Sequence, residues 1–122
     1  RKLSRKNWQD IEKMPIQKKE QTAISMFRQA LDEQLGEAIH KVVLFGSKAR
    51  GDDRAESDID LLILCNTDDW HIANTVYAIA TDVLLATGVA LSPKVLAREE
   101  YRRMERNSMP FVSNVVREGV AV

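Results

Sequence analysis

Two short apolar runs place the strongest constraint on the fold of this chain. Residues 39–45 and 59–64 are rich in Ile, Val and Leu, and polar residues bound each run. Runs of this length and composition are typical of buried strands. The polar segment between them is long enough for the second strand to return antiparallel beside the first. We therefore expect a small sheet in which these two strands are neighbours.

Apolar residues at spacings of three and four predict helices around these strands. One stripe covers about residues 16–35 and ends near Gly36, and a second follows Asp68–Asp69 and ends at Gly88. Residues 89–96 have the character of a third strand, which Pro93 places at an edge or a bulge. Short helices over 98–106 and after Pro110, then a final extended piece, complete the pattern. The interleaving predicts an α/β (α+β) fold with a small mixed sheet flanked by helices.

Length and composition indicate one compact domain. We expect it to span residues 1–122, with residues 1–15 as a loosely packed N-terminal extension. Basic and acidic residues balance at 18 each, so no global field favours nucleic acid as a partner. The single cysteine, Cys65, allows no disulfide within these residues, and no apolar run is long enough to span a bilayer. We expect a cytoplasmic protein without a membrane partner.

The pair Asp58 and Asp60 is the first candidate for chemistry. Residues two apart on a strand point to the same face, so the two carboxylates are expected to project side by side. Their repulsion is relieved by a divalent cation, and hard oxygen ligands suit Mg²⁺ or Mn²⁺. An isolated Asp-x-Asp is more often a solvated strand end, so the pair alone is a weak signal.

Gly46 and Ser47 close the first apolar run. Backbone N–H groups at a strand-to-helix turn bind phosphate oxygens, glycine permits close approach, and the serine hydroxyl adds a donor. A lone Gly-Ser is more often an ordinary turn. Antiparallel pairing of the two strands, however, would bring Gly46–Ser47 and Asp58-x-Asp60 to one edge of the sheet, so that a phosphate cradle faces a metal site.

The combined segment resembles the signature of the DNA polymerase β-like nucleotidyltransferases, which is Gly-Ser, ten residues and Asp-x-Asp. Residues 48–57 supply the ten-residue spacer, and the flanking residues are similar to those of the minimal nucleotidyltransferases. The resemblance implies transfer of a nucleoside monophosphate from an NTP to a hydroxyl, with release of pyrophosphate and a two-metal mechanism. It implies that Asp58 and Asp60 are catalytic and bind the metal, and that Gly46 and Ser47 bind phosphates. Arg50, and then Lys48, are candidates to neutralise triphosphate charge, although either could be a solvated cation.

The third strand departs from the pattern that the resemblance implies. The family's full site has a third carboxylate on a later strand, facing the first two, and residues 89–96 contain no acid. Ala90 or Ser92 would occupy its position. Glu99 and Glu100 follow the strand, and we expect them to pair with arginines on an exposed helix. Nucleotide binding should therefore survive better than catalysis.

Three functions remain open at this point. In the first, the chain transfers AMP from ATP to a hydroxyl of a protein, as the antitoxin of a HEPN toxin encoded nearby. In the second, a catalytically impaired nucleotidyltransferase fold neutralises its partner by contact. In the third, the acceptor is a small molecule such as an aminoglycoside, which the short chain disfavours. A homo- or hetero-oligomer is compatible with each, and Trp70, Tyr77 and Tyr101 are expected in the core or at its rim.

Overall fold

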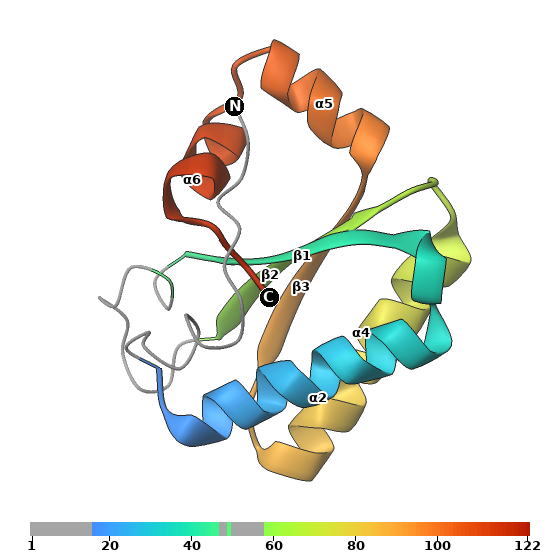
Figure 1. The fold of residues 1–122 in the computed structure, drawn as a ribbon, viewed down its shortest axis with the longest axis vertical. Helices are drawn as coiled ribbons and strands as arrows, with labels where there is room; N and C mark the ends of the chain where they lie inside the picture. Colours follow the sequence, from blue (N-terminus) through green and yellow to red (C-terminus); the bar gives the residue numbers. More distant parts are fainter. Residues whose placement is uncertain (1–15, 47–48, 50–57) are drawn as a thin grey trace.

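The computed structural model describes residues 16–46, 49 and 58–122 (Figure 1). The predicted N-terminal extension, residues 1–15, lies outside the described residues. The elements are, in chain order, α2 (Lys18–Gln34), the 3₁₀ helix η1 (Gly36–Ala38), β1 (Ile39–Phe45), β2 (Ile59–Cys65), α4 (Trp70–Thr87), β3 (Leu91–Ala97), α5 (Arg98–Arg106), α6 (Pro110–Glu118) and β4 (Val120–Ala121).

The strands form a mixed sheet in the order β3-β2-β1-β4. Strand β1 is antiparallel to both β2 and β4, whereas β2 and β3 are parallel and are joined through α4. The predicted α/β class, the mixed sheet and the antiparallel pairing of the first two strands are confirmed. Pro93 lies on β3, at an edge of the sheet, where a residue without an N–H donor is tolerated.

Helices cover both faces of the sheet, α2 and α4 on one side and α5 and α6 on the other (Figure 1). Side chains of β2 alternate between the two layers. Ile59, Leu61 and Ile63 belong to the apolar cluster under α2 and α4, whereas Leu62 and Leu64 belong to the cluster under α5 and α6. A strand covered on both faces must be apolar on both, which explains the continuous run in the sequence.

Local signals set the ends of α4. The Asp69 carboxylate accepts a hydrogen bond from the His71 amide at 2.9 Å, as an N-cap residue does. Gly88 terminates the helix in the left-handed conformation with φ +75°. Both predicted boundaries are confirmed. None of the helices among the described residues combines the length and apolar character needed to cross a membrane.

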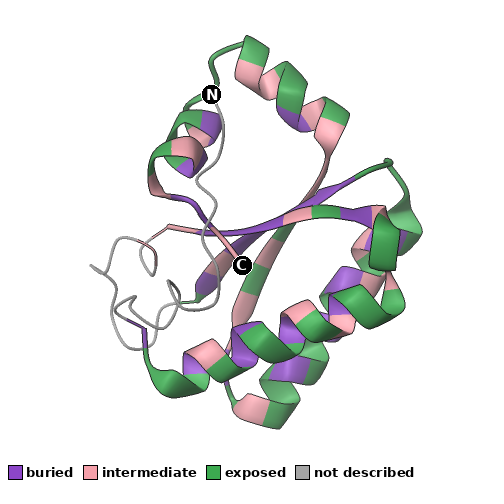
Figure 2. Cartoon of the chain, in the orientation of Figure 1, coloured by how far each residue is buried: buried purple, intermediate pink, exposed green. Residues whose placement is uncertain are grey.

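The aromatic residues of α4 do not lie in the core. The side chains of Ile72, Val76 and Val83 point inward, and this phase turns Trp70 and Tyr77 outward. Trp70 is 66% exposed and Tyr77 is 49% exposed, whereas Tyr101 on α5 is buried. The expected core or rim position is therefore confirmed for Tyr101 only. Figure 2 shows how buried and exposed positions alternate along the helices.

Candidate active site

The end of β1 and the start of β2 meet at one edge of the sheet. Phe45, the last residue of β1, pairs with Asp60 in the antiparallel register. Gly46 follows directly after β1, and Asp58 directly precedes β2. The expected meeting of the glycine and the two aspartates is therefore confirmed. Ser47, Lys48 and Arg50 lie outside the described residues, and their roles stay predictions.

Gly46 lies against the carboxylate of Asp60. Its φ is +80°, and a Cβ placed on it would lie 3.1 Å from the Asp60 Cγ and collide with the Asp60 Oδ2. Glycine is the residue that adopts this backbone conformation without strain and leaves this space open. Position 46 therefore demands glycine for two independent reasons, its positive φ and its close contact with the Asp60 carboxylate.

The two aspartates differ in exposure. Asp60 is half-buried, and the alternation of β2 places it on the same face as Leu62 and Leu64, under α5 and α6. Asp58 is exposed, and Ile59 between them is fully buried on the opposite face.

The chemistry of this pair suits a hard divalent cation. Two carboxylates supply oxygen ligands, and Mg²⁺ usually keeps several waters and binds through one or two carboxylates together with substrate phosphates. Gly46 leaves room for the Asp60 carboxylate to lie against the end of β1, where its oxygens would serve as ligands. Among the described residues no group of three or more His, Cys, Asp or Glu side chains could hold a metal. Asp58 and Asp60 would therefore hold the cation without a third acid from this part of the chain.

The register of β3 places Ser92 in the position next to Asp60. The two residues are partners in the parallel ladder, and Ser92 is exposed. Paired residues of neighbouring strands share a face, so the Ser92 hydroxyl lies on the side of the sheet that carries Asp60. Ala90 precedes β3, where its carbonyl accepts the Ile59 amide at 3.1 Å. Of the two candidates from the sequence, Ser92 is the one beside Asp60.

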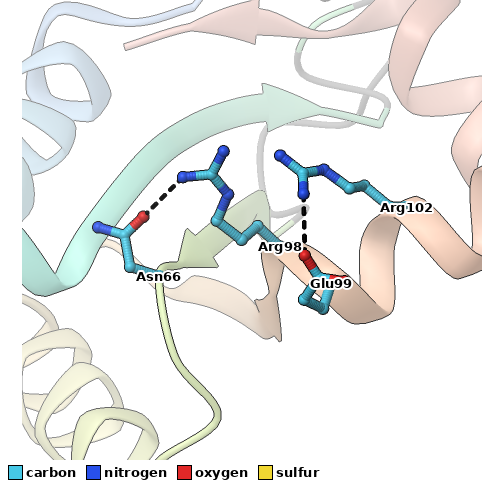
Figure 3. A network of polar contacts seen from close by, with 4 residues as sticks. All are labelled: Asn66, Arg98, Glu99 and Arg102. Carbon is cyan, nitrogen blue, oxygen red and sulfur yellow. Dashed lines mark hydrogen bonds and ion pairs between the residues drawn. The ribbon is translucent and has the colours of Figure 1, made fainter.

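Glu99 and Glu100 lie beyond the opposite end of the strands from Asp60. Because β3 runs parallel to β2, its last residue Ala97 pairs with Cys65, and α5 begins there. In Figure 3, Glu99 accepts a bond from Arg102 at 2.8 Å, and the neighbouring Arg98 binds Asn66 at 3.1 Å. Glu100 pairs with Arg103 at 2.6 Å. The expected exposed ion pairs are confirmed, and neither acid reaches Asp60.

Cys65 is not part of the candidate active site. It is buried at the far end of β2, and burial raises the pKa of its thiol to about 11. The thiol is therefore protonated at neutral pH and is a poor nucleophile. Cys65 is a small buried residue of the apolar core under α2 and α4.

A cluster of Phe45, Lys94 and Phe111 flanks Asp60 and was not predicted. The rings of Phe45 and Phe111 meet edge to face with centroids 5.5 Å apart, and the Lys94 Nζ lies 5.2 Å from the Phe111 centroid. Lys94 is two residues beyond Ser92 on β3 and shares its face. Two aromatic rings and one cation therefore lie on the face of the sheet that carries Asp60.

Comparisons with known proteins identify the family of this chain. The family described as "Polymerase beta, Nucleotidyltransferase" matches residues 27–122, which include Gly46, Asp58, Asp60 and β3. The chain belongs to the polymerase β nucleotidyltransferase family. It is also 36% identical over 100 residues to a Methanocaldococcus jannaschii protein named "Putative protein adenylyltransferase", and the match covers 82% of this chain and 94% of the relative. A crystal structure of a "putative nucleotidyltransferase" from Sulfolobus solfataricus is similar with a TM-score of 0.49 and 20% identity, over 86% of each chain.

Gly46 offers a test of the site that uses a second glycine of this nucleotidyltransferase as its control. Gly46→Ala is expected to cost about 1–2 kcal/mol for the positive φ, plus the displacement of the Asp60 carboxylate. Gly88→Ala carries a similar conformational cost, because φ is +75°, but its Cβ would meet nothing within 4 Å. Chemical denaturation should show destabilisation in both variants, larger in Gly46→Ala, and a Mn²⁺ titration should show lost metal binding only in Gly46→Ala. Equal metal binding in the two variants would show that the Gly46–Asp60 contact does not shape the site.

Proposed function

We propose that this nucleotidyltransferase transfers AMP from ATP to a hydroxyl of a protein, and that the acceptor is a HEPN-family toxin encoded nearby, for which the chain is the antitoxin. The observation that carries the proposal is the contact of Gly46 with Asp60 at the edge where β1 ends and β2 begins. A protein acceptor is supported by the relative named as a protein adenylyltransferase, because the alignment covers 94% of that relative. The HEPN partner and the antitoxin role are supported by the resemblance to minimal nucleotidyltransferases.

The described residues have distinct tasks in this reaction. Gly46 lets the triphosphate approach the backbone, and Asp58 and Asp60 hold the Mg²⁺ or Mn²⁺. When bound, the cation neutralises charge on the triphosphate and on the attacking oxygen. The hydroxyl oxygen of the acceptor forms a bond to the α-phosphorus, the bond to pyrophosphate breaks, and the hydroxyl proton passes to solvent. The product is a phosphodiester on the acceptor.

The acceptor hydroxyl must approach the face of the sheet that carries Asp60. Ser92 and Lys94 of β3 lie on this face, so β3 supplies no carboxylate beside Asp60 that could take the hydroxyl proton. We therefore expect a slow transfer that relies on an acceptor hydroxyl of low pKa. The phenol of a tyrosine ionises far more readily than an aliphatic hydroxyl, so it is the protein hydroxyl that suits this site best.

Transfer of label from ATP tests the proposal directly. The chain is incubated with Mg²⁺, the neighbouring HEPN-family protein and ATP labelled on either the α- or the γ-phosphate. Label on the partner is expected from α-labelled ATP only, and it should disappear in the Asp58→Ala/Asp60→Ala variant. Transfer of γ-label would indicate a kinase and would contradict the proposal.

The same experiment separates the alternatives. Loss of the toxin's activity without label on the partner would support neutralisation by contact, a reading that the missing third acid beside Asp60 favours. Label on an added aminoglycoside, and none on the partner, would assign a small-molecule acceptor. Either result overturns protein adenylylation by this chain.

A further inference from the structure

The outer face of α4 has the composition of a buried surface. The helix has 18 residues, of which Asp82 is the only acidic one and none is Lys or Arg, whereas 30% of the whole chain is charged. Its exposed apolar side chains are large: Trp70 is 66% exposed, Tyr77 49%, Leu84 42% and Leu85 80%. A helix that is apolar on both faces is ordinarily covered on both, and large exposed apolar patches mark interaction sites.

The exposed residues follow the spacing of a helix–helix seam. Trp70, Asn74, Tyr77, Thr81 and Leu84 are all exposed and are alternately four and three residues apart. This 3.5-residue repeat is the one by which two helices pack along each other over several turns, and a single Asn at such a position is a known means of fixing register. The Thr81 hydroxyl already donates to the Tyr77 carbonyl at 3.1 Å, so the threonine presents its methyl group to the seam.

We propose that this seam packs against the same helix of a second copy, forming a two-fold homodimer. A two-fold contact sets a surface against itself, so charged residues along its centre would repel their own copies. The seam contains none. Trp70 and Leu84 each lie seven residues from Tyr77, so in an antiparallel pair centred on Tyr77 the Trp70 side chain of each copy meets Leu84 of the other.

The position of α4 separates this surface from the acceptor. Helix α4 packs on the face of the sheet that carries Ile59, Leu61 and Ile63, and Asp60 points to the other face. A protein that receives AMP must reach Asp60, and pairing through α4 leaves that face open in both copies. The dimer is therefore compatible with activity but does not depend on the proposed acceptor.

The expected dimer is weak. An 18-residue helix is about 27 Å long, and one helix offers less than the roughly 800 Å² per partner of a standard interface. We expect a dissociation constant in the micromolar range. Sedimentation velocity of the full chain over a range of concentrations should show a monomer–dimer equilibrium, with Tyr77→Glu and Leu84→Glu each weakening it roughly thirtyfold or more, as a central hot-spot residue does.

Met109 provides a matched control, because it is 41% exposed and lies next to α6, on the opposite side of the sheet. Met109→Glu should leave the dimer intact, and thermal unfolding should show that each variant remains folded. In a Trp8→Phe background, dilution should shift the emission of Trp70 to longer wavelength as the seam becomes exposed to water.

Four results would overturn the proposal. The chain would be monomeric at all accessible concentrations, or a dimer would persist unchanged in both seam variants. A monomer in which Trp70 is shielded from acrylamide would instead show that another part of the same chain covers α4. A complex that forms only with a different protein, and is lost in Tyr77→Glu, would assign the seam to that protein.

Discussion

Asp60→Asn is expected to reduce AMP transfer by about two to three orders of magnitude, the usual loss when a preorganised charge at the reacting phosphate is removed. Asn has nearly the shape of Asp, so the side chain can still lie against Gly46 at the end of β1. The loss should therefore arise from charge and metal binding rather than from unfolding. Initial rates with labelled ATP and a Mn²⁺ titration followed by electron paramagnetic resonance would measure both effects.

Asp68→Asn is the matched control for this variant. Asp68 is an exposed acid that lies beyond the other end of β2, away from Gly46. Its replacement should leave rate and Mn²⁺ affinity unchanged. Retention of more than a third of the wild-type rate in Asp60→Asn would show that this carboxylate is not part of the catalytic site.

Ser92→Asp is expected to increase Mg²⁺ affinity on the order of tenfold or more, and to raise the transfer rate. The new carboxylate would stand beside Asp60 on the same face, since the two residues are ladder partners. A third acid adds ligand charge, which is the means by which proteins tighten such sites. Without metal, like charges directly opposite one another cost roughly 0.2–1 kcal/mol. Whether Ser92→Asp raises or lowers the stability of the fold should therefore depend on whether Mg²⁺ is bound.

Thermal unfolding with and without Mg²⁺ tests this dependence independently of activity. Ser92→Asp should unfold below the wild type in EDTA and gain more from Mg²⁺ than the wild type does. Ser92→Asn has a similar size without the charge and should show neither effect. If Ser92→Asp responds to Mg²⁺ as the wild type does, the position beside Asp60 does not face the metal.

Local signals in the sequence were sufficient to predict most of the fold. The apolar runs at 39–45 and 59–64, the cap at Asp69 and the left-handed Gly88 each depend on a few neighbouring residues, and each proved correct. The meeting of Gly46 and Asp60 also followed from the sequence, because an antiparallel return leaves few other ways to join two adjacent strands. The family to which the chain belongs was recognisable from the same segment.

Features that depend on register or on long-range contacts were not predictable. The choice between Ala90 and Ser92 depends on a single residue of shift between β2 and β3, and the sequence of β3 does not specify it. Lys94 and Phe111, which contact each other on the face that carries Asp60, come from elements far along the chain and meet only once the strand order is known. The outward position of Trp70 was not predicted, because α4 carries large apolar residues on its outer face as well as on the stripe that faces the core.

The alternation of β2 has a consequence for the way this family can change its sequence. Ile59 is fully buried on one face and Asp60 points to the other, within a strand whose remaining residues are all buried. An insertion or deletion of one residue here would turn the carboxylate into the core and an isoleucine toward the substrate, at a cost of several kcal/mol for the buried charge. Loss of the site by slippage would thus also be loss of the fold, so selection for a folded chain acts against insertions and deletions at this point of β2. By contrast, Ser92 is exposed on an edge strand and can be exchanged without this penalty, so the reactivity of the site can drift there while the fold persists.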